Sequence, residues 1–360
     1  MNAKCTYLLP LAILVAILAA PTAASARSTQ PPRLEAPTLA LLEFGNAAAR
    51  RTAILSTAPR RLAGASWWGG TYTGAGGEQI TVYVSTAYPE DETVARKWVD
   101  FFAGLVHGSE LPSMRAYVAP LDEVQEMCFS ADVIGCYGGQ KLVTVGDSSA
   151  GVPPASIAAH EYGHHIAANR TNAPWMALDW GTKRWSTYVG VCSRVNAGTA
   201  YPGDEGPNYS FNPGEGFAES YRVLFETNGS AVGYDWPIVD PSFRPDAQSL
   251  SAIREDVLHP WAGPTTMTIQ GKFLRRSSTW TRQVATPLDG DLHIRVTVPG
   301  GGGDDVRLLS SDGQTVLATG AWDSSGGKSV AYRVCGARSV KLRVTRGGAA
   351  ARFTVRVLVP

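Results

Sequence analysis

The sequence lacks several features that would each have pointed to a particular class of protein. It has almost no net charge, with 32 basic and 31 acidic residues, and the two signs are interspersed, which argues against nucleic acid or an anionic membrane as the main partner. Beyond its first residues it has no apolar run approaching the roughly 18 residues that cross a bilayer. It also has no internal repeat at solenoid spacing. We therefore expect a monomer with no integral membrane segment.

The chain begins with a segment typical of export. Lys4 precedes an apolar run at 8–20, and the small residues ASA follow that run. This arrangement predicts a signal peptide at 1–26, cleaved after Ala26, and hence a secreted protein. Residues 27–65 are then an N-terminal arm, a linker with one docked helix, or a removed propeptide. The sequence leaves these possibilities open.

Cysteine is scarce, with five residues in all. Four remain once the predicted signal peptide is removed, and an even number in an exported chain suggests disulfides. Cys128 and Cys136 flank the short loop FSADVIG, which a bridge could close, so we predict this pair. Cys192 and Cys335 are left to form a second bridge or to stay as free buried thiols.

A short motif carries the chemistry. His160, Glu161 and His164 form the pattern H-E-x-x-H, and positions i and i+4 of a helix share one face, so both imidazoles can reach one cation. Glu161 stands beside them, where a general base can touch a water on the metal. The alternative is a chance match on an ordinary helix. However, the flanking residues are mostly small or apolar, which predicts a buried helix at 154–169, and charged groups are rarely buried unless paired or bound to metal.

A catalytic zinc site usually takes three protein ligands and keeps a fourth position for water. Arg170 stands where the metzincin spacing requires a third histidine, which excludes that branch. Glu215, in a helix predicted at 213–227, is the better candidate, and Glu219 four residues later would accept a hydrogen bond from a ligand imidazole. The competing interpretation makes Glu215 part of a capping box with Asn212.

The stretches HEYGHH and EGFAE together resemble the gluzincin branch of the zincin metallopeptidases. This resemblance implies a bound Zn²⁺ held by His160, His164 and Glu215, with Glu219 as the hydrogen-bonding partner of a ligand. It also implies a secreted bacterial zinc metalloendopeptidase that hydrolyses a peptide or protein substrate with Glu161 as general base.

The resemblance extends to two further features of the expected site. A neutral donor should stabilise the oxyanion, and in some gluzincins a tyrosine just before the third ligand does so. We therefore expect Tyr209 in this role, with Tyr201 and Tyr221 as alternatives. The resemblance also implies that the predicted strand QKLVTV, at 140–145, is the sheet edge along which an extended peptide lies.

The pattern of elements predicts two domains. Residues 66–262 read as strand, helix, strand, strand and active-site helix, followed by mainly helical sequence, which we interpret as an α+β zincin-like metallopeptidase domain. Residues 265–360 contain short alternating runs separated by glycine-rich turns, which predict an all-β sandwich. That segment resembles the prepeptidase C-terminal domains that follow secreted bacterial proteases. The alternative is a sandwich that only stabilises the chain.

Two other functions compete with the metallopeptidase interpretation. The first is a catalytically inactive zincin-like binding protein, attached to a surface or polymer through its β-sandwich. The intact Glu161 argues against it, because a scaffold does not need a base. The second is a metal-dependent hydrolase that acts on something other than peptides. Peptide cleavage rests on the family resemblance alone.

Overall fold

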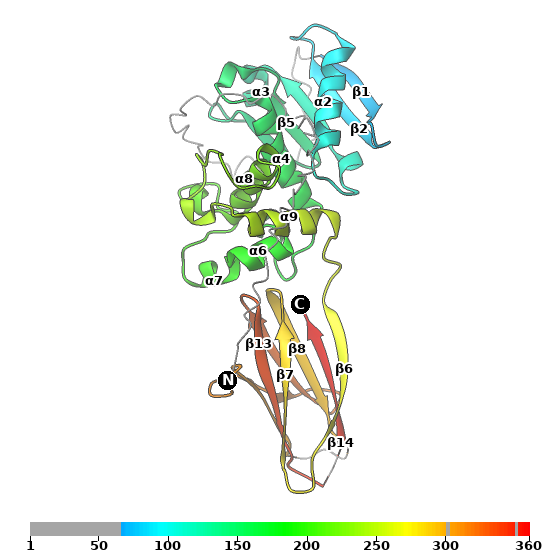
Figure 1. Cartoon of the computed structure of the whole chain (residues 1–360), viewed down its shortest axis with the longest axis vertical. Coiled ribbons are helices and arrows are strands. Elements are labelled where there is room, and N and C mark those ends of the chain that lie inside the picture. The colour runs from blue at the N-terminus through cyan, green and yellow to red at the C-terminus, as the bar shows by residue number, and fades with distance from the viewer. Residues whose placement is uncertain (1–65, 300–302, 350–351) are drawn as a thin grey trace, which may run out of the picture. The chain divides into compact units, whose positions relative to one another are not determined.

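A computed structural model describes residues 66–299, 303–349 and 352–360 (Figure 1). The predicted signal peptide at 1–26 and the predicted arm or propeptide at 27–65 lie outside the described residues. Within the described ranges, helices and strands are mixed up to residue 258, and from residue 265 onward the regular elements are strands alone. No helix in these ranges is long and apolar enough to cross a bilayer.

The first sheet has five strands in the order β1-β2-β3-β5-β4. Its three central strands are parallel, and both edge strands run antiparallel to their neighbours. Along each central strand, small or β-branched apolar side chains are buried, as in strands covered on at least one face. The strands are β1 (Trp67–Thr73), β2 (Gln79–Ser85), β3 (Arg115–Ala119), β4 (Gly135–Gly138) and β5 (Lys141–Val145).

The predicted edge strand is wrong. The sequence QKLVTV does form a strand, β5, but β5 pairs with β3 on one side and β4 on the other. Its backbone groups are therefore already used by the sheet. The two edges are β1 and β4. The edge next to β5 is β4 (Gly135–Gly138), whose four residues GCYG include two glycines. A strand this short and glycine-rich has no alternating pattern by which the sequence could reveal it.

The helices begin where local capping favours them. The Asp91 side chain accepts a hydrogen bond from the Thr93 backbone N–H, and Pro154 occupies the first turn of α4, where a missing N–H costs nothing. Asp246 and Ser249 form a capping box before α9. The helices are α2 (Glu92–Gly104), α3 (Leu121–Met127), α4 (Pro154–Ala168), α5 (Ala177–Trp180), α6 (Lys183–Val189), α7 (Val191–Asn196), α8 (Pro213–Glu226) and α9 (Ala247–Leu258).

Helices α4 and α8 pack directly against each other, and a glycine allows their close approach (Figure 1). A Cβ atom added at Gly163 would lie 2.7 Å from the Ala218 Cα and 3.1 Å from its carbonyl oxygen. Any side chain at this position would push the two backbones apart. Both helices are buried along most of their length. For α4, the apolar residues that flank the motif predicted this burial.

A buried ion pair anchors the end of α4. Arg170 donates to Glu110 Oε2 at 2.7 Å and to the backbone carbonyls of Asp256 and Val257, which end α9. Glu110 is 4% exposed and also accepts from the hydroxyl of Tyr162, on α4. Burial raises the pKa of Glu110, but the Gly108 N–H and Arg170 outweigh it and hold that pKa below its usual range. Arg170, which stands where a metzincin would have its third histidine, therefore links the end of α4 to Glu110 and to the last turn of α9.

Two antiparallel sheets make up the strand-only segment. Their orders are β10-β9-β13-β7 and β11-β12-β8-β14-β6. Along β8, β13 and β14, alternate residues are mostly buried valine, leucine, isoleucine or phenylalanine, which belong to one core, as expected of a sandwich. The strands are β6 (Thr265–Lys272), β7 (Thr279–Thr286), β8 (Gly290–Thr297), β9 (Asp305–Leu309), β10 (Val316–Thr319), β11 (Ala321–Trp322), β12 (Lys328–Val334), β13 (Arg338–Thr345) and β14 (Arg352–Val359).

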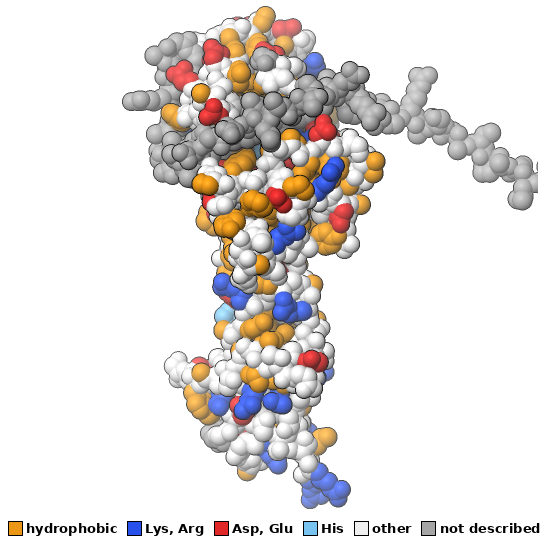
Figure 2. Space-filling model, turned by 90° about the vertical axis from the view of Figure 1, so that its left-hand side faces the viewer, with side chains coloured by type: hydrophobic (Ala, Val, Ile, Leu, Met, Phe, Trp, Pro, Cys, Tyr) orange, Lys and Arg blue, Asp and Glu red, His pale blue; other side chains and the backbone are white. Residues whose placement is uncertain are grey.

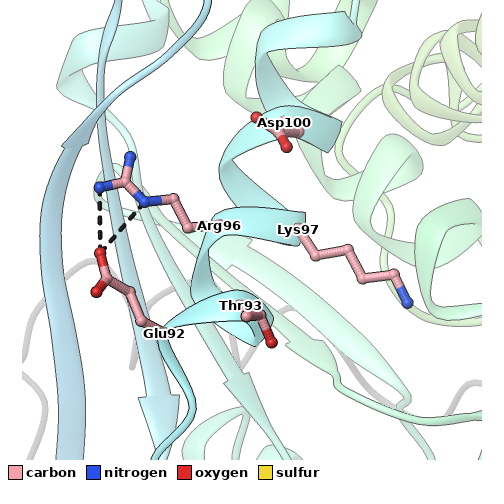
Figure 3. Close-up of a pocket in the computed structure, with 5 residues that line it drawn as sticks. All are labelled: Glu92, Thr93, Arg96, Lys97 and Asp100. Carbon is pink, nitrogen blue, oxygen red and sulfur yellow. Dashed lines mark hydrogen bonds and ion pairs between the residues drawn. The ribbon is translucent and has the colours of Figure 1, made fainter.

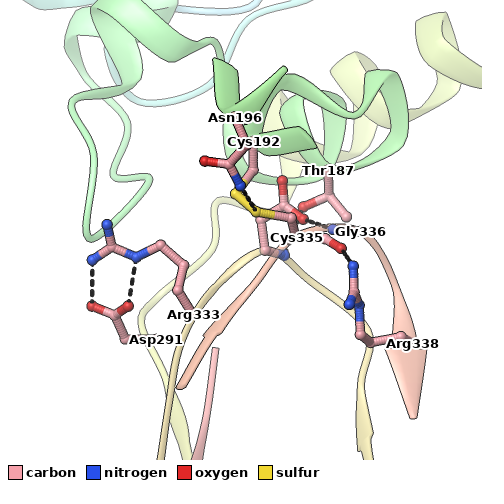
Figure 4. The surroundings of a disulfide bond; sticks show 9 residues. Thr187, Cys192, Asn196, Asp291, Arg333, Cys335, Gly336 and Arg338 are labelled. Carbon is pink, nitrogen blue, oxygen red and sulfur yellow. Dashed lines mark hydrogen bonds and ion pairs between the residues drawn. A yellow bond between two sulfur atoms is a disulfide. The ribbon is translucent and has the colours of Figure 1, made fainter. Parts of the chain in front are cut away.

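Both candidate cysteine pairs form disulfides. Cys128 and Cys136 join the end of α3 to the edge strand β4, as predicted from their spacing. Cys192 and Cys335, left open between a bridge and free thiols, join α7 to the residue that follows β12 (Figure 4). The Asn196 side-chain amide donates to Cys335 Sγ at 3.4 Å beside this second bridge.

We expect Arg170→Met to destabilise the protein by about 3 to 5 kcal/mol, because it leaves the Glu110 carboxylate buried without its cation. Urea unfolding measures the loss. Arg96→Met is the matched control, since Arg96 is half exposed in its ion pair with Glu92, and such a pair contributes less than about 1 kcal/mol. Equal losses in the two variants would contradict the anchoring role of Arg170.

Candidate metal centre

Two helices bring five chemically active side chains to one place. Helix α4 carries His160, Glu161 and His164, and α8 carries Glu215 and Glu219. All five are buried, with exposed fractions between 1% and 8%. Nitrogen atoms of the two histidines and a carboxylate oxygen of Glu215 lie within 4.8 Å of one another, so this group can hold a metal ion.

The spacing of these atoms suits a small cation. His160 Nε2 and His164 Nε2 each lie 3.3 Å from the same oxygen, Glu215 Oε2. Tetrahedral ligands at about 2.0 to 2.2 Å from a metal are separated by about 3.4 Å, whereas an N–H···O hydrogen bond is usually about 2.9 to 3.0 Å long. Both nitrogen–oxygen separations are therefore those expected of ligands of one ion.

Glu215 does not form the capping box that the competing interpretation predicted. Asn212 does cap α8, since its side chain accepts from the Gly214 N–H at 3.0 Å. Its own backbone N–H, which a capping box would satisfy with Glu215, donates instead to the Tyr209 carbonyl. The Glu215 carboxylate is left to face the two imidazoles.

Glu219 orients one of the histidines. Its Oε2 atom lies 3.0 Å from His160 Nδ1, so a carboxylate here accepts the Nδ1 proton and leaves Nε2 facing Glu215. Arg222 donates to both Glu219 oxygens, at 3.0 and 2.7 Å. Burial raises the pKa of Glu219, but the charge of Arg222 and the hydrogen bond from His160 lower it to about 2. Glu219 therefore stays ionised at any physiological pH.

Arg222 holds Glu219 in place, although the sequence did not lead us to predict it. It also donates to Glu226 and to the Asp235 carbonyl, so it is held on several sides. Its position three residues after Glu219, on the same face of the helix, is consistent with an ion pair between the two side chains. An arginine at that spacing is common on helix surfaces, however, and only its burial distinguishes it here.

Without a metal, the cluster balances its charge with a proton. Burial lowers the pKa of His160, but hydrogen bonds to the Glu215 and Glu219 carboxylates raise it to about 10. Burial raises the pKa of Glu215, but the charge of His164 and the hydrogen bonds from both histidines hold it well below its usual range. A dication and this proton compete for His160, because a metal ligand must be neutral imidazole.

Glu161 lies between the metal group and the sheet edge. A Cβ atom added at Gly135, on β4, would lie 3.1 Å from Glu161 Oε1 and 2.6 Å from the Ile157 side chain. Glycine at position 135 therefore leaves space for the carboxylate. The candidate base is next to the strand that ends the sheet.

The three candidate tyrosines have different partners. The Tyr209 hydroxyl donates to Glu215 Oε2 at 2.7 Å. Burial and the nearby Glu215 charge raise its pKa well above the usual value, so Tyr209 remains a proton donor. The Tyr201 hydroxyl donates to the Gly198 carbonyl and the Tyr221 hydroxyl to the Val106 carbonyl. Of the three, Tyr209 lies at the metal group.

Two other features lie away from this centre. His165 contacts the Tyr137 hydroxyl and the Glu110 carbonyl through its two ring nitrogens, which places it on the opposite side of α4. An open surface hollow on α2 contains none of the predicted site residues (Figure 3). It is lined by Glu92, Thr93, Arg96, Lys97 and Asp100.

Comparison with known proteins gives limited similarity. No family model matches the chain, and no curated protein matches it. One solved structure similar to part of the chain is a pre-peptidase C-terminal domain. It comes from a collagenase of Bacillus anthracis and is 18% identical, with a TM-score of 0.23, over 26% of this chain and 88% of that one.

Two further solved structures are similar to parts of the chain. PliG of Aeromonas hydrophila, a periplasmic inhibitor of g-type lysozyme, is 10% identical over 29% of this chain and 93% of its own, with a TM-score of 0.20. The structure of infectious bursal disease virus, Gt strain, is 13% identical over 36% of this chain and 35% of its own, with a TM-score of 0.14. The evidence for function is therefore the geometry of the metal group.

We expect the metal-free protein to lose stability as the pH rises through about 10. The pKa of His160 is about 10 in the folded protein and about 6.5 in an unfolded chain. The stability from this proton is fully present below about pH 6.5 and is lost as the pH passes the folded pKa. Urea unfolding in chelator between pH 6 and 10.5 measures the loss. The same pH dependence in His160→Gln would contradict this origin.

We expect Arg222→Lys to weaken the binding of added Zn²⁺ by about 10-fold or more. Arg222 donates hydrogen bonds to both oxygens of Glu219, and a lysine ammonium cannot reproduce this bidentate contact. Glu219 would then orient His160 less well. Competition with a chelating dye measures the affinity. Arg184→Lys is the control, since Arg184 pairs with another buried acid, Asp256, at 2.8 Å. An unchanged affinity in Arg222→Lys would show that Glu219 needs no support from Arg222.

Proposed function

We propose that this protein is a zinc metallopeptidase of the gluzincin type, which cleaves internal peptide bonds. The observation that carries the proposal is the convergence of His160, His164 and Glu215 within 4.8 Å, with Glu161 adjacent on the same helix. Two histidines and one carboxylate, with one coordination position left over, are a ligand set of catalytic zinc sites. A purely structural zinc site would be closed by a fourth protein ligand and would need no base.

The donor set favours zinc among common metals. Imidazole nitrogens suit zinc, copper, iron and nickel, whereas magnesium and calcium prefer oxygen ligands. The 3.3 Å separations between Glu215 Oε2 and the two imidazole nitrogens fit a tetrahedral ion. When bound, zinc lowers the pKa of a water and polarises a carbonyl group.

Side chains of this protein would carry out proton transfer, stabilise the oxyanion and orient a metal ligand. Glu161 accepts the proton of the attacking water and returns it to the leaving amine. Tyr209 remains protonated, and its single hydroxyl proton goes to Glu215 in this structure. With substrate bound, the hydroxyl would turn to donate this proton to the oxyanion instead. Glu219 holds His160 in the tautomer that binds metal.

A peptide is the substrate that best fits the surroundings of the base. Among the described residues, β4 pairs with β5 alone, and such an edge can add an extended peptide as a further strand. Gly135 on that strand is next to Glu161 Oε1. A peptide bond held along β4 would therefore lie within reach of the base. This reassigns the expected substrate-binding edge from 140–145 to β4 (Gly135–Gly138).

The wider proposal follows from these parts. Residues 66–262 would form a zincin-like catalytic domain and residues 265–360 an accessory sandwich of the prepeptidase C-terminal type. The protein would be exported by a bacterium, which agrees with the signal-like N-terminal sequence and with the two disulfides.

Three single substitutions test the assignment of roles. Glu215→Ala should lose the metal. Glu161→Gln should keep about one zinc per chain and lose about 10²-fold or more of its activity, since the base is gone while the ligands remain. Tyr209→Phe should keep the metal and slow turnover by about 10²-fold, because one oxyanion donor is lost. Metal analysis and casein hydrolysis, each with and without chelator, measure these effects.

The same assays separate the alternatives. Zinc without hydrolysis of casein or of a mixed peptide library would support the inactive binding protein. Hydrolysis of an ester substrate alone, sensitive to chelator and to Glu161→Gln, would support a metal-dependent hydrolase of another class. Normal zinc content in Glu215→Ala would show that the third ligand is wrong.

A further inference from the structure

The two signs of charge are interspersed locally, but the near-neutral total conceals a difference in net charge between two parts of the chain. Residues 265–360 contain 14 lysine and arginine residues but only 6 aspartates and no glutamate, for a net charge of +8. The first 264 residues contain 18 basic and 25 acidic residues, for a net charge of −7. The strand-only segment is therefore a cationic module joined to an acidic one.

The aspartates of this segment neutralise only part of its surface. Asp289 and Asp304 are buried, with exposed fractions of 1% and 3%. Three others pair with one arginine each, and Asp312 accepts from the Gln314 N–H within its own turn. Eleven of the 14 cations thus have no ion-pair partner among the described residues, and none of the eleven is buried.

Cations face each other directly across neighbouring strands at three places. Lys272 on β6 is opposite Arg352 on β14, and Arg356 on β14 is opposite Arg295 on β8. In the other sheet, Arg343 on β13 is opposite Arg307 on β9. Like charges directly opposite each other destabilise a sheet. In two of the three pairs one arginine already has an aspartate partner, Arg295 with Asp323 and Arg307 with Asp305. The repulsion is therefore uncompensated between Lys272 and Arg352, and an anion bound there would relieve it.

The outward face of β14 has the spacing of a site for an extended ligand. Arg352, Thr354 and Arg356 point outward, while the residues between them are buried. Four residues of strand separate the two arginines by about 13 Å. Between them, the Thr354 hydroxyl donates to the Gln270 side chain at 3.2 Å. A cation pair at one end and Arg356 at the other, with hydroxyl and amide groups between them, suit a ligand that alternates charge with hydroxyl groups.

We propose that residues 265–360 bind an acidic polysaccharide through these outward-facing cation pairs. The pairs lie on the outer faces of both sheets of the sandwich, so a flexible chain can reach them all, whereas a planar bilayer meets only one face. Figure 2 shows one face of the molecule, where Lys and Arg side chains recur along the strand-only part and at its tip.

This inference does not depend on the metal centre, and its test uses no substrate. The purified chain is titrated with heparin over a range of salt concentrations. The paired variant Lys272→Thr/Arg352→Thr removes one cation pair with a residue that favours strands. Arg96→Thr/Lys97→Thr removes two exposed charges from α2 and is the matched control.

We expect heparin to bind the unmodified chain, with an affinity that falls steeply with salt. The strand variant should bind at least about 10-fold more weakly, with a salt slope reduced by about two. Its urea midpoint should be equal to or higher than that of the unmodified chain, because the repulsion is gone. The α2 control should bind within about 2-fold of the unmodified chain.

Three outcomes would overturn the proposal. One is no binding to heparin at low salt. The second is an equal loss of affinity in the strand variant and the α2 control, which would make the effect one of total charge. The third is tighter binding, at the same ionic strength, to vesicles containing anionic lipid or to duplex DNA, which would assign the surface to that partner.

Discussion

The candidate site depends on one contact, the close packing of α4 against α8. Neither helix has a complete ligand set, since α4 supplies the two histidines and α8 supplies Glu215. The distance between the helices is set where Gly163 meets the backbone of Ala218. A small change in that distance would separate the carboxylate from the imidazoles, because a metal group tolerates displacements of only a few tenths of an ångström.

Burying this group requires charge balance, and the fold supplies it through a closed network. Ser156 at the start of α4 donates to Glu226 on α8, Arg222 links Glu226 to Glu219, and Glu219 contacts His160 on α4. The network thus leaves α4, runs along α8 and returns to α4. A buried carboxylate is tolerated when it is paired and fully hydrogen-bonded. The same pairing that makes burial possible also fixes the orientation of His160.

The two disulfides connect the parts of the chain around this centre. The Cys128–Cys136 disulfide holds the edge strand β4, beside which Glu161 lies. A second disulfide links α7 to the strand-only segment, which has most of the unpaired positive charge. If the proposed peptide cleavage and the proposed binding of an acidic polymer both hold, this disulfide would keep the metal centre near substrates embedded in that polymer.

The sequence by itself determined the features that depend on local periodicity: the helix of His160 and His164, the helix of Glu215, and the strand-rich C-terminal segment. Helical spacing and strand alternation are patterns among neighbouring residues, so they can be recognised without knowledge of the fold. Tyr209 was expected at the site through the family resemblance, and its hydroxyl does contact Glu215. The fold was needed to show that β4 covers the edge of β5, that Arg222 contacts Glu219, and that cations face each other across strands. The first and last of these features depend on which distant segments pair, and pairing is settled by packing and register that no local pattern encodes.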